Sequence, residues 1–181
     1  MVSRRKGRPL RIILGVSGSI AAYKSCTIVR GLVSAGAQVR CVLTKNAEKF
    51  VSSLTLGVLS RNKTCVDLFD PAEWDMAHLC AASWADRILI APATADLMAR
   101  LASGRSAGAL EATVLSATCP VFVAPAMDTE MWEHKATQAN VKTLKSFGYK
   151  ILGPVRGELA SGRSGVGRLM EPEALVRAVL K

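Results

Sequence analysis

The segment from residue 9 to residue 43 contains the feature that most constrains the fold. Its apolar run predicts a buried strand that ends at Val16, a helical periodicity extends from Ile20 to Ala35, and a second strand is predicted over 39–43. A tight Ser-Gly-Ser turn, residues 17–19, joins the first strand to the helix. Strand, glycine turn, helix and strand in so short a window are typical of a parallel βαβ unit.

The same alternation continues to the end of the chain. The further predicted elements are helices over 46–59, 78–84, 95–101, 107–118, 131–147 and 173–180, and strands over 64–69, 87–91, 121–124 and 149–152. Pro92 and Pro125 are expected to stop the strands that precede them. We therefore predict an α/β fold: a single doubly wound, Rossmann-like (flavodoxin-like) domain whose mainly parallel sheet is covered on both faces. The domain is expected to span 10–181.

Two segments are expected to be disordered: the basic tail over 1–9 and the glycine-rich stretch over 157–167. The chain carries 24 Lys and Arg against 14 Asp and Glu, a formal net charge of +10, which favours small anionic partners. Because no basic stripe is interleaved with aromatic residues, a nucleic-acid partner is not expected. No stretch approaches the roughly 20 apolar residues of a membrane span.

The five cysteines form no Cys-x-x-Cys pair. An odd number of unpaired cysteines indicates reduced thiols and a cytoplasmic protein, with no metal site predicted.

The carboxyl ends of parallel strands meet at one edge of the sheet, where ligands of doubly wound proteins bind. Ser17, Gly18, Ser19 and Ile20 form a phosphate-type turn there, although Ser17 and Ile20 replace the second and third glycines of G-x-G-x-x-G. A purely structural turn is the equally weighted alternative. Thr44 follows the second strand, either as a phosphate ligand or as a helix N-cap.

Two strand-ending Ala-Pro pairs contribute to the same edge. The first is followed by Ala93, Thr94 and Ala95, and the second by Ala126. Their small side chains leave room for a flat ring against the backbone, so two such loops favour a planar ligand. The basic stretch 157–168 is either a flap over an anionic substrate or a flexible loop.

The two histidines, His78 and His134, are ordinary structural or surface residues unless other features support them.

Read together, these segments resemble the homo-oligomeric flavin-containing cysteine decarboxylases, over about residues 11–172. The family includes phosphopantothenoylcysteine decarboxylase of coenzyme A biosynthesis and the decarboxylases of peptide C-terminal cysteines. The matching segments are Gly15–Lys24, Met76–Leu79 with Trp84–Asp86, Pro92–Leu97, Pro125–Trp132 and Gly157–Leu169. Their order and coverage favour membership of this family.

The resemblance implies FMN as cofactor, with FAD as the less favoured alternative that the turn alone would also accept. The cofactor-binding residues that follow are Ser17, Gly18, Ser19, Ile20, Thr44, Pro92, Ala93, Thr94, Ala95 and Ala126. The implied catalytic residues are His78, Asp128 and Ser161, and the implied substrate-binding residues are Asp128, Met131, Ala160, Ser161 and Arg168. The implied assembly is a homotrimer, or a dodecamer built from trimers, with each site shared between subunits.

The implied reaction is oxidation of a cysteinyl substrate to a thioaldehyde, followed by loss of CO2 to give an enethiol or aminothiol. Three departures from the family pattern bear on it. Asp128 replaces an asparagine that holds the substrate carboxylate, Ser161 replaces a redox-active cysteine, and 104–109 lacks the family's Asn/Asp-Asp pair. An ionised Asp128 would repel a carboxylate, and a serine performs no thiol redox chemistry.

Three functions follow from this sequence. The first is an FMN-dependent decarboxylase (a lyase) with an altered active site at Asp128 and Ser161. The second is a flavin-dependent oxidoreductase of another small molecule on the same fold, in which Asp128 binds an amine or ring N–H. The third is a non-catalytic partner that completes a site with a non-identical subunit.

Overall fold

The structure, a computed structural model, describes residues 8–68 and 77–181, without the side chains of 77–80. Within these residues a six-stranded parallel sheet has the order β3-β2-β1-β4-β5-β6. The strands are β1 Arg11–Val16, β2 Gln38–Leu43, β3 Thr64–Cys65, β4 Arg87–Ala93, β5 Val121–Pro125 and β6 Lys150–Ile151. The chain reverses its direction across the sheet between β1 and β4, which confirms the doubly wound α/β fold.

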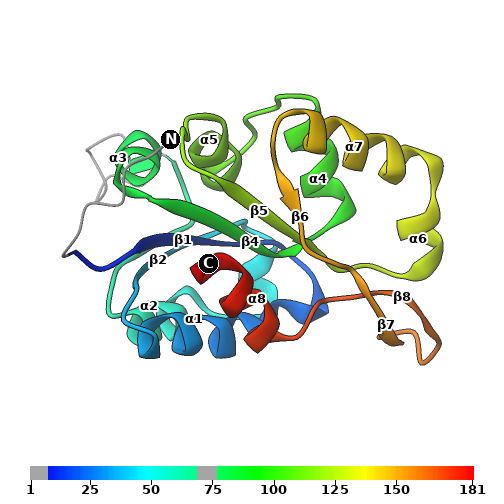
Figure 1. Ribbon diagram of the computed structural model, residues 1–181, viewed down its shortest axis with the longest axis horizontal. Helices are drawn as coiled ribbons and strands as arrows, with labels where there is room; N and C mark the ends of the chain where they lie inside the picture. Colours follow the sequence, from blue (N-terminus) through cyan, green and yellow to red (C-terminus); the bar gives the residue numbers. More distant parts are fainter. Residues whose placement is uncertain (1–7, 69–76) are drawn as a thin grey trace.

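Helices cover both faces of the sheet (Figure 1). One face carries α1 Ser25–Ser34, α2 Ser53–Ser60 and α8 Pro172–Leu180, and the other carries α3 Ala77–Trp84, α4 Ala95–Ala102, α5 Ala109–Leu115 and α7 Lys135–Ser146. The alternation of strand side chains divides the core accordingly. Ile12 and Leu14 join the cluster under α1 and α8, whereas Ile13 joins the cluster under α4 and α5.

The predicted helix over 20–35 begins as a 3-10 helix, η1 Ile20–Lys24, and continues as α1. Two other predicted helices are interrupted. The first divides into η2 Ala47–Lys49 and α2, because Ser52 is extended and its hydroxyl caps α2 by accepting from Thr55 N. The second divides into α6 Thr129–Glu133 and α7, because the extended His134 accepts a hydrogen bond from Ala136 N. Both breaks follow from capping side chains, which compete with helix continuation.

The prolines do not stop their strands where expected. β4 continues through Pro92 to Ala93, with a shift of register between Ile90 and Ala93, and β5 includes Pro125. At the bulge the carbonyl of Pro92 accepts a hydrogen bond from Ser17 N at 3.2 Å. The irregular end of β4 thereby joins the glycine turn that follows β1.

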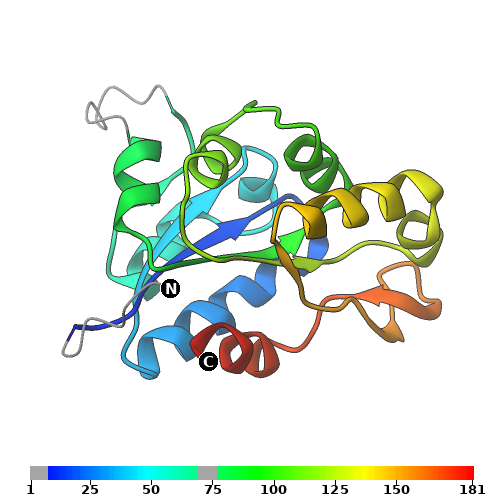
Figure 2. The same ribbon diagram turned by 45° about the horizontal axis from the view of Figure 1, so that its top comes forward.

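The prediction that 157–167 is disordered was wrong. This segment forms an antiparallel hairpin of β7 Val155–Glu158 and β8 Ser164–Arg168 at one end of the molecule (Figures 1 and 2). Met127 N donates to Gly167 O at 3.0 Å, and a Cβ at Gly167 would lie 2.2 Å from Met127 O. The glycines read as a sign of flexibility instead permit close packing of the hairpin against the end of β5.

Residues 1–7, most of the tail expected to be disordered, lie outside the described residues. At its boundary, Arg8 forms an ion pair with Asp86 at 2.5 Å. No helix in the described ranges is both long and apolar enough to cross a lipid bilayer.

Candidate functional site

An open cavity of about 420 Å³ lies between η1, the end of β5 and the β7–β8 hairpin. It brings together residues that the sequence assigned to two different ligands. Three of its lining residues, Ser19, Ile20 and Ala126, were predicted to contact the cofactor. Three others, Asp128, Ala160 and Arg168, were predicted to contact the substrate. The tertiary structure therefore places cofactor and substrate candidates around one space at the carboxyl edge of the sheet.

The two serines of the glycine turn have different roles. Ser17 is 1% exposed, donates from its hydroxyl to Pro92 O at 2.8 Å and accepts from Thr94 N at 2.9 Å. Its only proton is therefore used to brace the turn against the end of β4. Gly18 lets the same turn approach the segment between β2 and η2, because a Cβ at this position would lie 2.6 Å from Asn46 Cβ.

Three other hydroxyl groups accept hydrogen bonds from backbone N–H groups near the strand ends. Ser19 accepts from Ala21 N at 3.2 Å, Thr44 from Ala47 N at 3.3 Å, and Thr94 from Leu97 N at 3.3 Å. A hydroxyl that accepts in this way keeps its own proton to donate. The Thr44 hydroxyl thus bonds the backbone at the start of η2, although the N-cap position of that helix is Asn46, and its proton remains suited to a phosphate oxygen.

The residues around these hydroxyls suit a flat cofactor that carries a phosphate. Ala93 and Ala126 are buried and small, which allows a ring to approach the backbone. Thr94 is the N-cap of α4, and Ala95 is the first residue of the helix, so a helix N-terminus points toward the same edge of the sheet. The chemistry of the donors and the small side chains therefore fits FMN.

Asp128 and Ser161 come together although 33 residues separate them in sequence. The Ser161 hydroxyl, at the tip of the hairpin, donates to Asp128 Oδ2 at 2.6 Å. Hydrogen bonds with the side chain of Glu130 and then with Ser161 hold the pKa of Asp128 below its usual range. Asp128 is therefore ionised at neutral pH, and its Oδ1 makes no hydrogen bond of good geometry within the described residues.

Not all predicted site residues meet at this cavity. Met131 lies on α6 and is half exposed, and it does not line the cavity. His78 lies in the first turn of α3, and its side chain lies outside the described residues. Figures 1 and 2 both place α3 and the β7–β8 hairpin at opposite ends of the molecule. One chain therefore does not bring His78 next to Asp128.

Two residues of the site were missed by the sequence reasoning. Lys24 lines the cavity from the end of η1, and its Nζ lies 3.5 Å from Glu171 Oε2. Glu171 also binds Arg168, with Nη2 and Oε1 2.6 Å apart. Lys24 ends the recognised turn motif and could have been singled out from it. Glu171 lies only three positions from Arg168, but no local signal marks its contact with Lys24, which is 147 positions away.

A second polar group lies next to residues 104–109, the segment that lacks the family's Asn/Asp-Asp pair. Glu111 on α5 is 1% exposed and forms an ion pair with Arg100 on α4. Arg100 also binds Asp96 at 2.6 Å. Glu111 and Arg100 line a smaller cavity of about 240 Å³ that also includes Thr44. A buried ion pair thus joins the two helices beside the edge where the cofactor candidates lie.

Comparison with known proteins also indicates a flavoprotein. The model of the family described as Flavoprotein matches residues 2–181. The coenzyme A biosynthesis bifunctional protein CoaBC of Mycobacterium bovis is 48% identical over 169 residues, which are 92% of this chain and 40% of that protein. The chain therefore spans about two fifths of the length of this curated relative.

Solved structures with similar folds include two decarboxylases. A PPC decarboxylase mutant complexed with pantothenoylaminoethenethiol matches with a TM-score of 0.86 and 30% identity, covering 94% of this chain and 96% of that one. The FMN-dependent cysteine decarboxylase SpaF matches with a TM-score of 0.78 and 31% identity, covering 93% and 97% of the two chains. The similarity thus extends over nearly the whole of both structures.

Proposed function

Because this chain belongs to the Flavoprotein family, we propose that it is an FMN-dependent decarboxylase of a cysteinyl substrate. Its place among relatives of coenzyme A biosynthesis makes phosphopantothenoylcysteine the first substrate to test. The observation that carries the proposal is the single cavity shared by Ser19, Ala126, Asp128 and Arg168. A flavin and a substrate must touch for electrons to pass between them, and this cavity is lined by candidates for both.

FMN would be held by the hydroxyls of Ser19, Thr44 and Thr94 at its phosphate and by Ala93 and Ala126 beside its ring. When bound, it would supply the acceptor for the hydride, with its two electrons, that leaves the carbon bearing the sulfur of the cysteinyl side chain. The substrate thiol releases the accompanying proton, and the carbon–sulfur bond becomes a thioaldehyde. Loss of CO2 then leaves its electron pair on the thioaldehyde, which becomes an enethiol after sulfur is protonated. The ligand in the similar PPC decarboxylase, pantothenoylaminoethenethiol, is an enethiol.

Ser161 determines which product leaves the site. A hydroxyl cannot donate the reducing equivalents that convert an enethiol to an aminothiol. Its proton is instead donated to Asp128, which keeps the tip of the hairpin against the cavity. The product proposed for this chain is therefore the unreduced enethiol.

The site requires a second copy of the chain. His78 of the partner subunit would supply the proton-accepting group near the substrate thiol, because α3 lies far from the hairpin within one chain. Neutral imidazole is suited to this task near neutral pH. The assembly that this arrangement favours is a homotrimer, or a dodecamer of trimers.

One observation favours a second candidate function, a flavin-dependent oxidoreductase of another small molecule. Asp128 is ionised, and its buried Oδ1 has no hydrogen bond of good geometry in the described part of the chain. Such an oxygen would accept a hydrogen bond from an amine or a ring N–H. It would repel the carboxylate that a decarboxylase must bind.

The two functions are separated by one set of assays on the FMN-reconstituted protein. Phosphopantothenoylcysteine and a cysteine-ending peptide are incubated anaerobically with it, and CO2 and the mass of the product are measured. Release of CO2 supports the decarboxylase if the product is lighter than the substrate by the mass of CO2 and two hydrogens. Absence of CO2 with both substrates, together with reduction of the flavin by NAD(P)H, would favour the oxidoreductase.

A further inference from the structure

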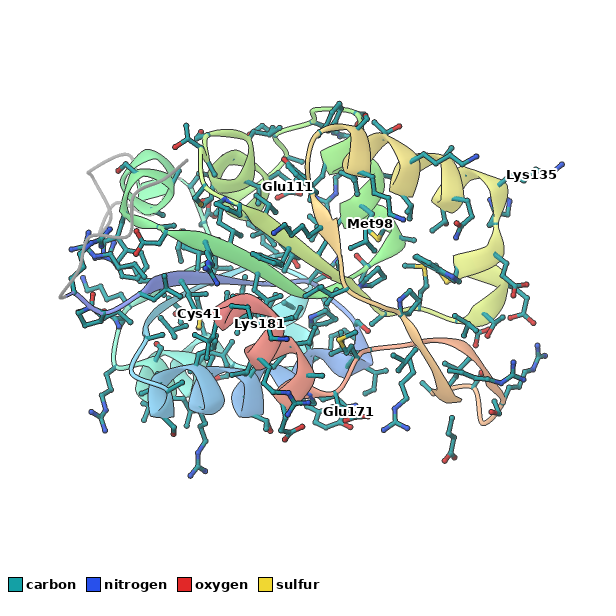
Figure 3. All side chains as sticks on the ribbon, in the orientation of Figure 1. Cys41, Met98, Glu111, Lys135, Glu171 and Lys181 are labelled. Carbon is teal, nitrogen blue, oxygen red and sulfur yellow. The ribbon has the colours of Figure 1, made fainter. Side chains whose placement is uncertain are left out.

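Two cations line the same cavity as Asp128. Lys24 reaches it from the end of η1, and Arg168 reaches it from the end of β8. Both are bound to Glu171, which Figure 3 shows at the beginning of α8. Each oxygen of this carboxylate serves one cation, so the two positive groups are held close together. One negative charge is thus shared between two positive charges.

Both cations are held in position without a ligand. The side chain of Lys24 is only 14% exposed, so packing along its stem restricts the conformations open to it. The stem of Arg168 lies across Gly157, where a Cβ would be 2.8 Å from Arg168 Cδ. Groups that are already ordered lose less conformational entropy when they bind a ligand.

We propose that Lys24 and Arg168 form a subsite for an oxyanion of the substrate. The inference deepens the proposed function and rests on it for the identity of the substrate. A guanidinium group matches the geometry of a carboxylate or a phosphate, and an ammonium group adds a second positive charge. With Glu171 the three groups carry a net charge of +1, which a bound oxyanion neutralises.

The subsite also orients the substrate. The acidic residues that line the cavity are Asp128 and Glu158, and the pKa of Asp128 is lowered by its hydrogen bonds. An anionic group is repelled by ionised Asp128 and attracted by Lys24 and Arg168. The polarity of the cavity therefore directs the substrate's anion toward η1 and the end of β8.

A phosphate and a carboxylate share this chemistry, and non-reacting ligands distinguish them. Calorimetry on the FMN-loaded protein compares 4′-phosphopantetheine with pantetheine, which lacks only the phosphate. A second arm compares N-acetylserine with N-acetylethanolamine, which lacks only the carboxylate, and neither has a thiol that can be oxidised. In one of these pairs the anionic member should bind at least about tenfold more tightly than its neutral counterpart, because a charge-assisted hydrogen bond contributes at least that much affinity.

Substitutions then locate the contact. Lys24→Met and Arg168→Gln should each abolish most of that preference, whereas Lys24→Arg should retain it because it keeps the charge. Lys142→Gln removes a positive charge from an exposed position on α7 and should leave the preference unchanged. The flavin absorbance spectrum checks that each variant is folded and loaded.

If neither pair shows a preference in the parent protein, or if Lys24→Met and Arg168→Gln both preserve it, the oxyanion subsite is wrong. This result is independent of the proposed reaction. A preference without release of CO2 would overturn the decarboxylase and leave the subsite standing. Turnover with no preference in either pair would overturn the oxyanion subsite and leave the decarboxylase standing.

Discussion

Ser161 Oγ donates a 2.6 Å hydrogen bond to Asp128 Oδ2 and thereby joins the tip of the β7–β8 hairpin to the loop between β5 and α6. These two residues occupy the positions where the resemblance leads us to expect a cysteine and an asparagine. Their contact gives each an interaction that the expected pair would not make in the same form. An ionised carboxylate can accept the serine proton, and this pairing favours the charged form of Asp128.

The first prediction concerns this charge. Ser161→Ala should move the pKa of Asp128 upward toward its ordinary value, although Glu130 would keep it partly lowered. Because the pKa in the folded state lies below the unfolded value, the contact contributes stability above the unfolded pKa. That contribution is lost as the pH falls through the folded pKa. The titration of carboxyl ¹³C signals, with Asp128→Asn used to assign the resonance, measures the shift. An Asp128 pKa unchanged by Ser161→Ala would contradict the prediction.

The second prediction concerns substrate handling. Asp128→Asn should raise kcat/KM for a cysteinyl substrate about tenfold or more, since two like charges about 4 Å apart repel by up to about 4 kcal/mol near a protein surface. Asp128→Ala removes the charge without adding an amide donor and should improve kcat/KM less. Combining Asp128→Asn with Ser161→Cys should shift the product from the enethiol toward the reduced aminothiol, as mass spectrometry would show. A lower kcat/KM for Asp128→Asn would mean that the carboxylate itself takes part in the reaction.

The third prediction separates the two serines of the glycine turn. Ser17→Ala removes a buried hydroxyl with two partners and should lower the free energy of unfolding by about 1–3 kcal/mol in urea. Ser19→Ala removes a cap and a hydroxyl that faces the cavity. It should weaken FMN binding, measured by the recovery of flavin fluorescence, by a larger factor than Ser17→Ala does. Equal losses of FMN affinity in the two variants would show that the turn acts as a unit.

The fourth prediction concerns the docking of the hairpin. Gly167→Ala places a Cβ 2.2 Å from Met127 O and should cost about 1–3 kcal/mol of stability as the hairpin shifts away. Binding of a substrate analogue should weaken with it, because Arg168 follows directly. Gly57→Ala is the matched control: its Cβ would meet Asn62 O at 3.4 Å, an ordinary contact within α2. This change should raise stability by up to about 1 kcal/mol. Undiminished analogue binding by Gly167→Ala would separate the cavity from the hairpin.

The fifth prediction concerns the buried ion pair between Arg100 and Glu111. Arg100→Met leaves the carboxylate of Glu111 buried without its cation and should cost about 3–5 kcal/mol in the free energy of unfolding. Glu111→Leu should cost less, because Arg100 keeps Asp96 at 2.6 Å and is 22% exposed. The double variant should recover most of the loss. Denaturation of the three variants tests this, and strictly additive losses would argue against the pair.

The sequence predicted the fold well because its signals are local and repeated. The apolar run before Ser17, the glycine turn and the helical periodicity after it all arise within one βαβ unit, and the structure shows that unit. The errors also have local causes. Ser52 and His134 cap helices that the periodicity had joined, and capping depends on a single side chain that periodicity does not register.

The candidate site was predicted in part. The sequence singled out Asp128, Ser161 and Arg168, but it gave no reason to place Asp128 in hydrogen-bonding contact with Ser161. It treated Ser17 and Ser19 alike, whereas the structure uses the proton of Ser17 to bind Pro92 O. The glycines of 157–167 suggested mobility, since their lack of a side chain is equally compatible with flexibility and with close packing.

By itself the sequence predicted the alternation of strands and helices as far as β6, the edge of the sheet where ligands are expected, and the residue types present there. Hydrophobic periodicity, turn chemistry and motif order are properties of neighbouring residues and can be read along the chain. Only the tertiary structure decided which distant side chains meet. It showed that Ser161 binds Asp128, and that Glu171 binds Lys24. Such contacts depend on how separate elements pack, and the energy of packing is set by the whole fold rather than by any local segment.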